Sequence, residues 1–254
     1  MIFVYFVGTA GSGKSSLTSA YHEWCIRNHF NAITVNLDPG VRNLPYEPEV
    51  DVREWISLDE VMTDYELGPN GAQVACADMV ALNATEIANR INTFRTDYVL
   101  MDTPGQLELF VFRSTGTVIV NHLNPNQSLL AFVIEPALAT TPANLVSQLM
   151  LSAITQFRMN VPLFNVLSKI DIIEEKALDT ILEWGENPGK LFQDLMVESP
   201  TLYHQLSEGI MAIIKEMEAQ TKLMPVSSET LAGLEDVYTM IQNIFMGGED
   251  LERE

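Results

Sequence analysis

The chain has 254 residues, 47% of them hydrophobic, which is enough to bury the core of one large α/β domain. Its 34 acidic and 14 basic residues give a net charge of −20, which disfavours direct binding to nucleic acid or to anionic membranes. No apolar run is long enough for a transmembrane helix, the N-terminal apolar run lacks the features of a signal peptide, and the two cysteines have no C-x-x-C spacing. We therefore expect a cytoplasmic protein without disulfides.

A strand predicted over residues 2–7 and a helix predicted over 16–30 flank a glycine-rich stretch at 8–15. This stretch reads G-x-x-x-x-G-K-S, which between a strand and a helix indicates a phosphate-binding loop. Its glycines let backbone N–H groups converge on an anion, Lys14 is expected to reach the outer phosphates, and Ser15 is expected to bind Mg²⁺. The nucleotide-binding residues expected here are Ala10, Gly11, Ser12, Gly13, Lys14, Ser15 and Ser16.

The next predicted strand, residues 31–38, ends in Asp38, followed by Pro39-Gly40. Ligands of open α/β sheets bind at the carboxyl ends of strands, so Asp38 is a candidate for contact with Mg²⁺ or its waters. An aspartate before Pro-Gly is equally typical of a turn, and both interpretations stay open. A proline-containing loop at 41–50 follows.

Residues 51–62 show a helical pattern, with Asp51 and Glu54 at a spacing like that of a capping box. A role of this segment in a nucleotide-responsive switch is the alternative. The sequence Gly68-Pro69-Asn70 then predicts a tight turn and the start of a long helix over about 72–94.

A strand over residues 97–102 ends in Asp102 and continues into Thr103-Pro104-Gly105-Gln106, the D-x-P-G-Q form of a Walker B and switch II region. Asp102 can hold a water of the Mg²⁺ shell. The Gly105 N–H can donate to a γ-phosphate, and a nearby glutamine can orient the attacking water.

The last motif concerns the base. Strands are predicted at 128–134 and 162–167, with a helix at 143–157 between them, and the second strand leads into Ser168-Lys169-Ile170-Asp171. This resembles N-K-x-D, the guanine-reading motif of GTPases, with Ser168 in place of asparagine. The Asp171 carboxylate can accept from both guanine donors, and the Lys169 stem can lie over the ring. A final strand at 222–228 and a helix at 231–245 follow, and Ser228 stands where GTPases contact the base.

These motifs together resemble the GPN-loop GTPases, and the Gly-Pro-Asn sequence is what singles out that family. The matching segments are residues 8–15, 36–38, 51–53, 68–70, 102–108 and 168–171. We therefore expect an α/β fold, a P-loop NTPase three-layer sandwich with a mostly parallel central sheet. The whole chain, 1–254, is expected to form a single GTPase domain with helices inserted at about 174–221.

The resemblance implies hydrolysis of GTP to GDP and phosphate with Mg²⁺, the metal being held by Ser15, Asp102 and Asp38. Asp102, Gln106 and Glu108 are expected to position or activate the water. The resemblance also implies a homodimer in which Gly68, Pro69 and Asn70 of each subunit enter the partner's active site, where Asn70 acts in trans.

The dimer is expected to act as a conformational switch or assembly factor, with an assembly client such as RNA polymerase, to which eukaryotic relatives are linked. The alternative is a P-loop kinase that transfers phosphate from ATP to a small molecule or polynucleotide. The scarcity of Lys and Arg argues against the cationic lid that such a kinase usually has.

Overall fold

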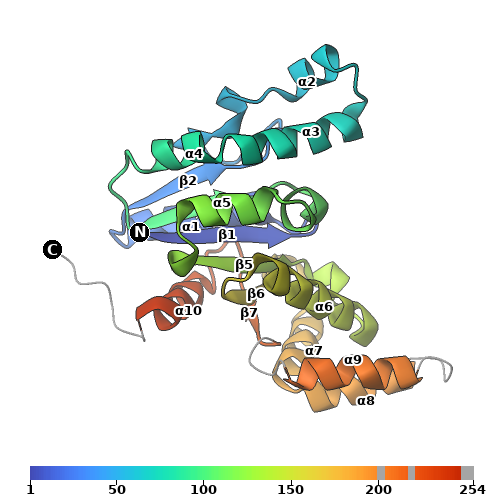
Figure 1. Cartoon of the computed structure of the whole chain (residues 1–254). Helices are drawn as coiled ribbons and strands as arrows, with labels where there is room; N and C mark the ends of the chain where they lie inside the picture. Colours follow the sequence, from blue (N-terminus) through green and yellow to red (C-terminus); the bar gives the residue numbers. More distant parts are fainter. Residues whose placement is uncertain (199–203, 217–220, 247–254) are drawn as a thin grey trace. The chain divides into compact units, whose positions relative to one another are not determined.

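Seven strands form the centre of the structure, a computed structural model that describes residues 1–198, 204–216 and 221–246. The strands are β1 (Ile2–Gly8), β2 (Ala32–Asn36), β3 (Val50–Asp51), β4 (Tyr98–Asp102), β5 (Ser128–Ile134), β6 (Leu163–Leu167) and β7 (Leu223–Pro225). They are ordered β3-β2-β4-β1-β5-β6-β7 (Figure 1). The pairs β1–β4, β2–β4, β2–β3 and β6–β7 are parallel, which confirms the predicted P-loop type of α/β sheet.

Helices connect most of the strands along the described part of the chain. The helices are α1 (Lys14–Arg27), α2 (Leu58–Asp64), α3 (Pro69–Leu82), α4 (Ala84–Ile91), α5 (Thr115–Leu123), α6 (Pro142–Met159), α7 (Glu175–Glu186), α8 (Pro188–Glu198), α9 (His204–Glu216) and α10 (Leu234–Met246). Short helical turns are η1 (Val52–Glu54), η2 (Glu108–Phe112), η3 (Pro125–Gln127), η4 (Pro136–Leu138) and η5 (Ile170–Ile172). In the part of the chain that the structure describes, no helix is long and apolar enough to cross a membrane.

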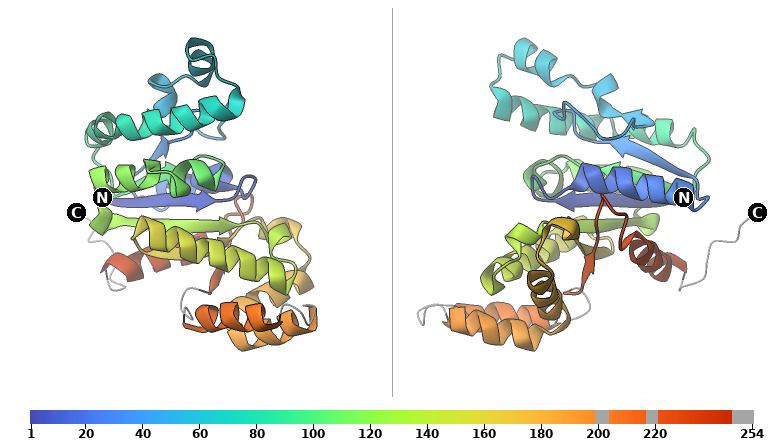
Figure 2. Two further views of the ribbon diagram at one scale, coloured as in Figure 1. Left: turned by 45° about the vertical axis from the view of Figure 1, so that its right-hand side comes forward. Right: turned by 180° about the vertical axis from the view of Figure 1, so that it is seen from behind.

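The chain divides into two compact units, of which the first comprises residues 1–131 and 156–162. In this unit α1 covers one face of the sheet and α3, α4 and α5 cover the other (Figures 1 and 2). Every residue of β1 and β4 is buried, as the near-continuous apolar strands of a doubly covered parallel sheet require. Aromatic contacts such as Tyr5 with Phe110 and Phe6 with Tyr21 fill the space between strands and helices.

The second unit comprises residues 132–155 and 163–254, as far as these are described. Strands β6 and β7 pair in parallel, and the Val226 N–H donates to the Leu167 carbonyl at 2.8 Å, so the loops that follow the two strands lie side by side. Helices α7, α8 and α9 stand in the chain between these strands, in the segment expected to be helical, whose residues 199–203 and 217–220 lie outside the described part.

Two predicted helices were wrong in extent. Residues 50–54 form β3 and η1 instead of the start of a helix, because Val50 and Asp51 pair with β2 and the Asp51 carboxylate caps η1 by accepting from the Arg53 N–H. The long helix expected over 72–94 is interrupted at Asn83, whose side-chain amide donates to the Met79 carbonyl at the end of α3. The strand β3 was not predicted, since two residues are too few to show a period.

Candidate nucleotide-binding site

The loop after β1 has the backbone geometry that a phosphate-binding loop needs. Gly11 and Gly13 have φ values of 82° and 95°, in the left-handed region that favours glycine. Helix α1 begins directly after Gly13, whose carbonyl accepts from the Leu17 N–H. The unpaired N–H groups of the first turn of α1 are thereby directed toward the loop, as anion binding requires.

The ammonium group of Lys14 lies inside this loop. The residue is only 5% exposed, and its Nζ donates to the carbonyl oxygens of Gly8 at 3.1 Å, Thr9 at 3.0 Å and Gly105 at 3.3 Å. Burial lowers the pKa of Lys14, and nearby carboxylates partly oppose that effect. Lys14 therefore links the glycine-rich loop to the turn after β4, which the sequence separates by about ninety residues.

Asp102, at the end of β4, is the second buried charge. Its Oδ2 accepts a hydrogen bond of 2.8 Å from the Tyr46 hydroxyl, while its buried Oδ1 accepts none from the described part of the chain. Burial raises the pKa of Asp102 to about 6, although the nearby hydroxyls of Ser15 and Tyr46 and the Lys14 ammonium lower it. Burial, followed by the neighbouring Asp102 carboxylate, also raises the pKa of Tyr46, so its hydroxyl stays protonated.

Ser15 and Asp102 together fit a divalent cation that also takes oxygen ligands from phosphates and water. The buried Oδ1 of Asp102 has no donor, and oxygen is the ligand that Mg²⁺ prefers. Among the described residues, no group of three or more His, Cys, Asp or Glu could hold a metal. The arrangement is thus suited to a cation that arrives with a phosphate ligand.

Asp38 is hydrogen-bonded through both carboxylate oxygens to backbone N–H groups in this conformation. Its Oδ1 accepts from the Gly40 N–H at 2.8 Å, as in an Asx turn, and its Oδ2 accepts from the Gly105 N–H at 3.2 Å. The turn interpretation therefore describes this conformation. The Gly105 N–H, expected to serve a γ-phosphate, is engaged by the Asp38 carboxylate.

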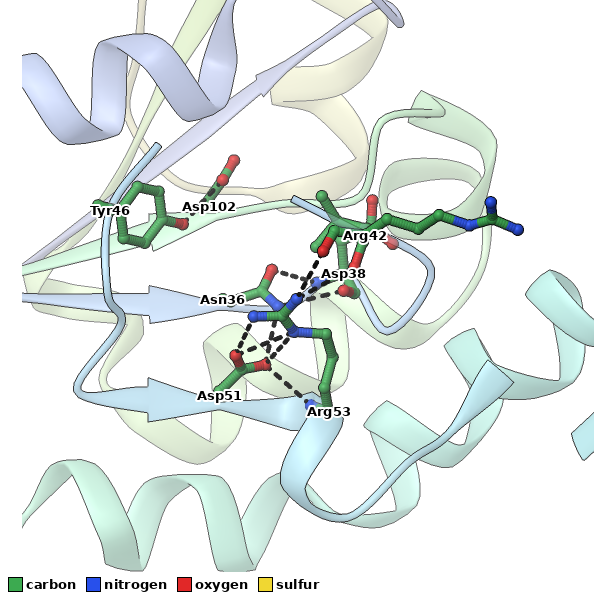
Figure 3. Close-up of polar contacts among 8 residues, drawn as sticks. Asn36, Asp38, Arg42, Tyr46, Asp51, Arg53 and Asp102 are labelled. Carbon is green, nitrogen blue, oxygen red and sulfur yellow. Dashed lines mark hydrogen bonds and ion pairs between the residues drawn. The ribbon is translucent and has the colours of Figure 1, made fainter. Parts of the chain in front are cut away.

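A polar network joins Asp38 to the segment around β3 (Figure 3). Asn36 accepts from the Asp38 N–H at 3.0 Å and donates to Asp51 Oδ1 at 2.9 Å. The Asp51 carboxylate makes an ion pair with Arg53, whose Nη1 reaches the Val41 carbonyl at 3.2 Å. Burial raises the pKa of Asp51, but hydrogen bonds from Arg53 and Asn36 leave that pKa lowered overall, so the carboxylate is charged. This network fixes the loop that begins at Asp38.

The residues expected to act on water follow Asp102 directly. Gln106 is exposed, and its amide donates to the side chain of Gln73 on α3 at 3.4 Å. Glu108 is also exposed and begins η2. Both side chains are exposed in the segment that follows the buried Asp102, so water has access to them.

The Gly-Pro-Asn sequence forms the start of α3. Gly68 is the N-cap and Pro69 the first helical residue, so Asn70 is not itself the cap. Asn70 is exposed, and its side chain makes no hydrogen bond to another described residue. A cavity of about 450 Å³ lies at this helix start. Residues of the loop after Asp38, of η1, of α2 and of α3 are among its lining, namely Pro39, Arg42, Arg53, Met62, Pro69 and Gln73.

The base motif lies in the second unit. Ser168 is buried, and its hydroxyl donates to the Ile134 carbonyl at 3.2 Å. Lys169 pairs with Glu135 at 2.7 Å, and Asp171 accepts from the Ser227 hydroxyl at 2.6 Å. The partner of Asp171 is thus Ser227, a residue that the sequence did not single out. Ser227 was missed because neighbouring serines differ only in which way the loop turns them.

Three comparisons relate the chain to known proteins. A family model described as "conserved hypothetical ATP binding protein" matches residues 6–247. The chain is 30% identical to GPN-loop GTPase PAB0955 of Pyrococcus abyssi over 94% of its own length and 95% of that protein's, and 27% identical to GPN-loop GTPase 3 of Dictyostelium discoideum over 97% and 87%. The crystal structure of PAB0955, a GTPase in its apo form, superposes with a TM-score of 0.87 at 29% identity, over 96% of this chain and 97% of that one.

The ionised Asp102 should destabilise the nucleotide-free protein. Because its pKa of about 6 in the folded protein lies above its ordinary value of 3.8, the free energy of unfolding falls as the pH rises between these values, and the full penalty for ionisation is present above pH 6. Asp102→Asn should therefore raise the free energy of unfolding by about 1–3 kcal/mol at pH 7.5, and by about 1 kcal/mol less at pH 5. Urea denaturation at both pH values measures this, with the exposed Asp179→Asn as the control. Equal stability of Asp102→Asn and wild type at pH 7.5 would contradict the expectation.

Proposed function

The chain belongs to the GPN-loop GTPase family, and we propose that it hydrolyses GTP to GDP and phosphate with Mg²⁺ as a homodimer. The observation that carries this proposal is the buried Lys14 ammonium inside the glycine loop, bonded only to carbonyl oxygens among its described hydrogen-bond partners. A buried cation beside convergent N–H groups suits the outer phosphates of a nucleoside triphosphate.

The metal would be held by Ser15 and Asp102, whose buried Oδ1 has no donor. When bound, Mg²⁺ neutralises charge on the phosphate oxygens and so lowers the barrier to phosphoryl transfer. Asp38 is engaged by two backbone N–H groups in this conformation, so a metal contact by Asp38 would require it to release them.

The protein's own groups would then act on the phosphate and on the water. Lys14 neutralises charge on the outer phosphates, and the Gly105 N–H donates to the γ-phosphate in exchange for Asp38. The Gln106 amide orients the attacking water, and the Glu108 carboxylate accepts a hydrogen bond from it. Both residues are exposed directly after the buried strand end, where water has access.

Guanine recognition is supported by Asp171, which the Ser227 hydroxyl holds at 2.6 Å. A carboxylate can accept from both the N1–H and the N2–H₂ of guanine, and adenine offers no such pair of donors. This chemistry favours GTP, although the description of the matching family model refers to ATP. The relatives named above are GTPases.

The homodimer is proposed because Asn70 is exposed at a helix start and its side chain makes no hydrogen bond to another described residue. In a two-fold dimer each Gly-Pro-Asn segment would complete the partner's site. The biological role proposed is that of a cytoplasmic conformational switch for assembly of a protein client such as RNA polymerase. The net charge of −20 supports a protein client over nucleic acid or a membrane surface.

The central experiment is Lys14→Ala. Losing the buried ammonium should reduce phosphate release from GTP at least about 100-fold and weaken nucleotide binding, because the outer phosphates would lose the charged hydrogen bonds that this group donates. The control Lys176→Ala removes the charge of an exposed side chain on α7, and it should leave phosphate release and nucleotide binding unchanged. A kinase would need a molecule that accepts the phosphate, whereas a GTPase transfers it to water. Release of phosphate from GTP without any added acceptor molecule therefore distinguishes hydrolysis from the kinase alternative. Undiminished turnover by Lys14→Ala would refute the proposed phosphate site.

Base selection is tested with Asp171→Asn. An amide can donate to the 2-oxo group of xanthine, so the variant should lose affinity for GTP about tenfold or more and gain affinity for XTP. Competition among GTP, ATP and XTP for a fluorescent nucleotide measures the ranking. An unchanged ranking would mean that Asp171 does not read the base.

The trans role is tested by mixing two inactive variants. Asn70→Ala should bind GTP and dimerise but hydrolyse poorly, and Lys14→Ala should retain a normal Asn70. Random exchange makes half the dimers mixed, each with one complete site, so about a quarter of wild-type activity should return. With exchange confirmed by mass spectrometry, activity that stays at the sum of the separate variants would rule out the trans role.

A further inference from the structure

Tyr46 lies in the loop between β2 and β3, yet its hydroxyl reaches the carboxylate at the end of β4 (Figure 3). The hydroxyl donates to Asp102 Oδ2 at 2.8 Å across 56 positions of sequence. None of the motifs that indicated nucleotide chemistry includes this residue. Its contact is with the carboxylate proposed above to hold the metal or its water.

The hydrogen bond gives the two oxygens of Asp102 different environments. Oδ2 accepts from Tyr46, while Oδ1 is buried and accepts no hydrogen bond from any residue that the structure describes. Rotation about χ2 would exchange the two oxygens of an unrestrained carboxylate, because that torsion is soft. A donor on one oxygen opposes this rotation and keeps the other oxygen available.

The loop holds Tyr46 in place by contacts that do not involve its hydroxyl. Before it in the chain, the Pro45 carbonyl accepts from the Ser19 hydroxyl on α1 at 3.4 Å. After it, the Glu49 carboxylate accepts from the Thr34 N–H at 2.6 Å and from the Thr34 hydroxyl at 2.9 Å. The loop is therefore anchored on both sides, and the phenol can be directed at Asp102 at little entropic cost.

We propose that Tyr46 is a positioning residue for Asp102: its hydroxyl holds one carboxylate oxygen so that the other is presented to the metal of the nucleotide complex. This inference rests on the proposed function, because it assumes that Asp102 serves Mg²⁺. Partners that hydrogen-bond to a metal-binding carboxylate typically change metal affinity 10–100-fold when they are removed. A residue that merely closes the loop would instead affect stability and nucleotide binding with or without metal.

The test is Tyr46→Phe in the full chain, which removes the hydroxyl and keeps the ring. The readout is the dissociation rate of a fluorescent GDP analogue as a function of free Mg²⁺, together with the thermal midpoint of unfolding. The half-saturating Mg²⁺ concentration should rise about tenfold or more, while the rate in EDTA stays within about twofold of wild type. The matched control, Tyr65→Phe, makes the same chemical change at a residue that is 60% exposed, and should behave as wild type.

The outcomes separate this inference from the proposed function. Equal half-saturating concentrations in wild type and Tyr46→Phe, with a clear Mg²⁺ response in both, would overturn the inference alone. An equal change of the dissociation rate in EDTA and in Mg²⁺ would also overturn the inference, because a purely structural role of Tyr46 predicts that result. A wild-type rate that does not respond to Mg²⁺ would overturn the proposed metal site and this inference with it.

Discussion

The constraint on which the site depends is the burial of the Lys14 ammonium. A buried charge must find partners, and here three carbonyl oxygens from two distant loops supply them. Those carbonyls are positioned by the glycine turn after β1 and by the turn after β4, and the parallel pairing of these strands brings the turns together. The pairing of β1 with β4 thus supplies the acceptors that the Lys14 ammonium needs. It also places the Asp102 carboxylate, at the end of β4, near this ammonium.

Much of this arrangement was predictable from the sequence because it depends on local signals. The apolar strand, the glycine spacing and the Lys-Ser pair all indicate a P-loop within fifteen residues. Asp102 followed by Pro-Gly-Gln is equally compact. Each of these motifs predicts both a secondary-structure element and a chemical role for its residues. The parallel sheet, with its strand ends at one edge, followed from these predictions.

What escaped prediction depends on contacts between segments far apart in the chain. Tyr46 sits in a loop without any period, and only the fold brings it to Asp102. The hydrogen bond between Ser227 and Asp171 depends on the path of the loop after β7, and the engagement of Asp38 depends on where Gly105 lies. The helix expected from residue 51 failed for the same reason, because pairing with β2 overrides the local helical preference.

The contacts of the Gly105 N–H and the Lys14 ammonium have a thermodynamic consequence. In this structure both groups already have oxygen acceptors, from Asp38 and from backbone carbonyls. If a phosphate binds these two groups as proposed, it substitutes for existing acceptors, and the number of hydrogen bonds at the two groups changes little. The free energy of such an exchange is a difference between bond strengths, in which charged oxygens exceed neutral carbonyls. At Lys14 the gain would come from replacing a neutral acceptor with an anionic one, whereas at Gly105 one anion would replace another, so this source of gain is absent there.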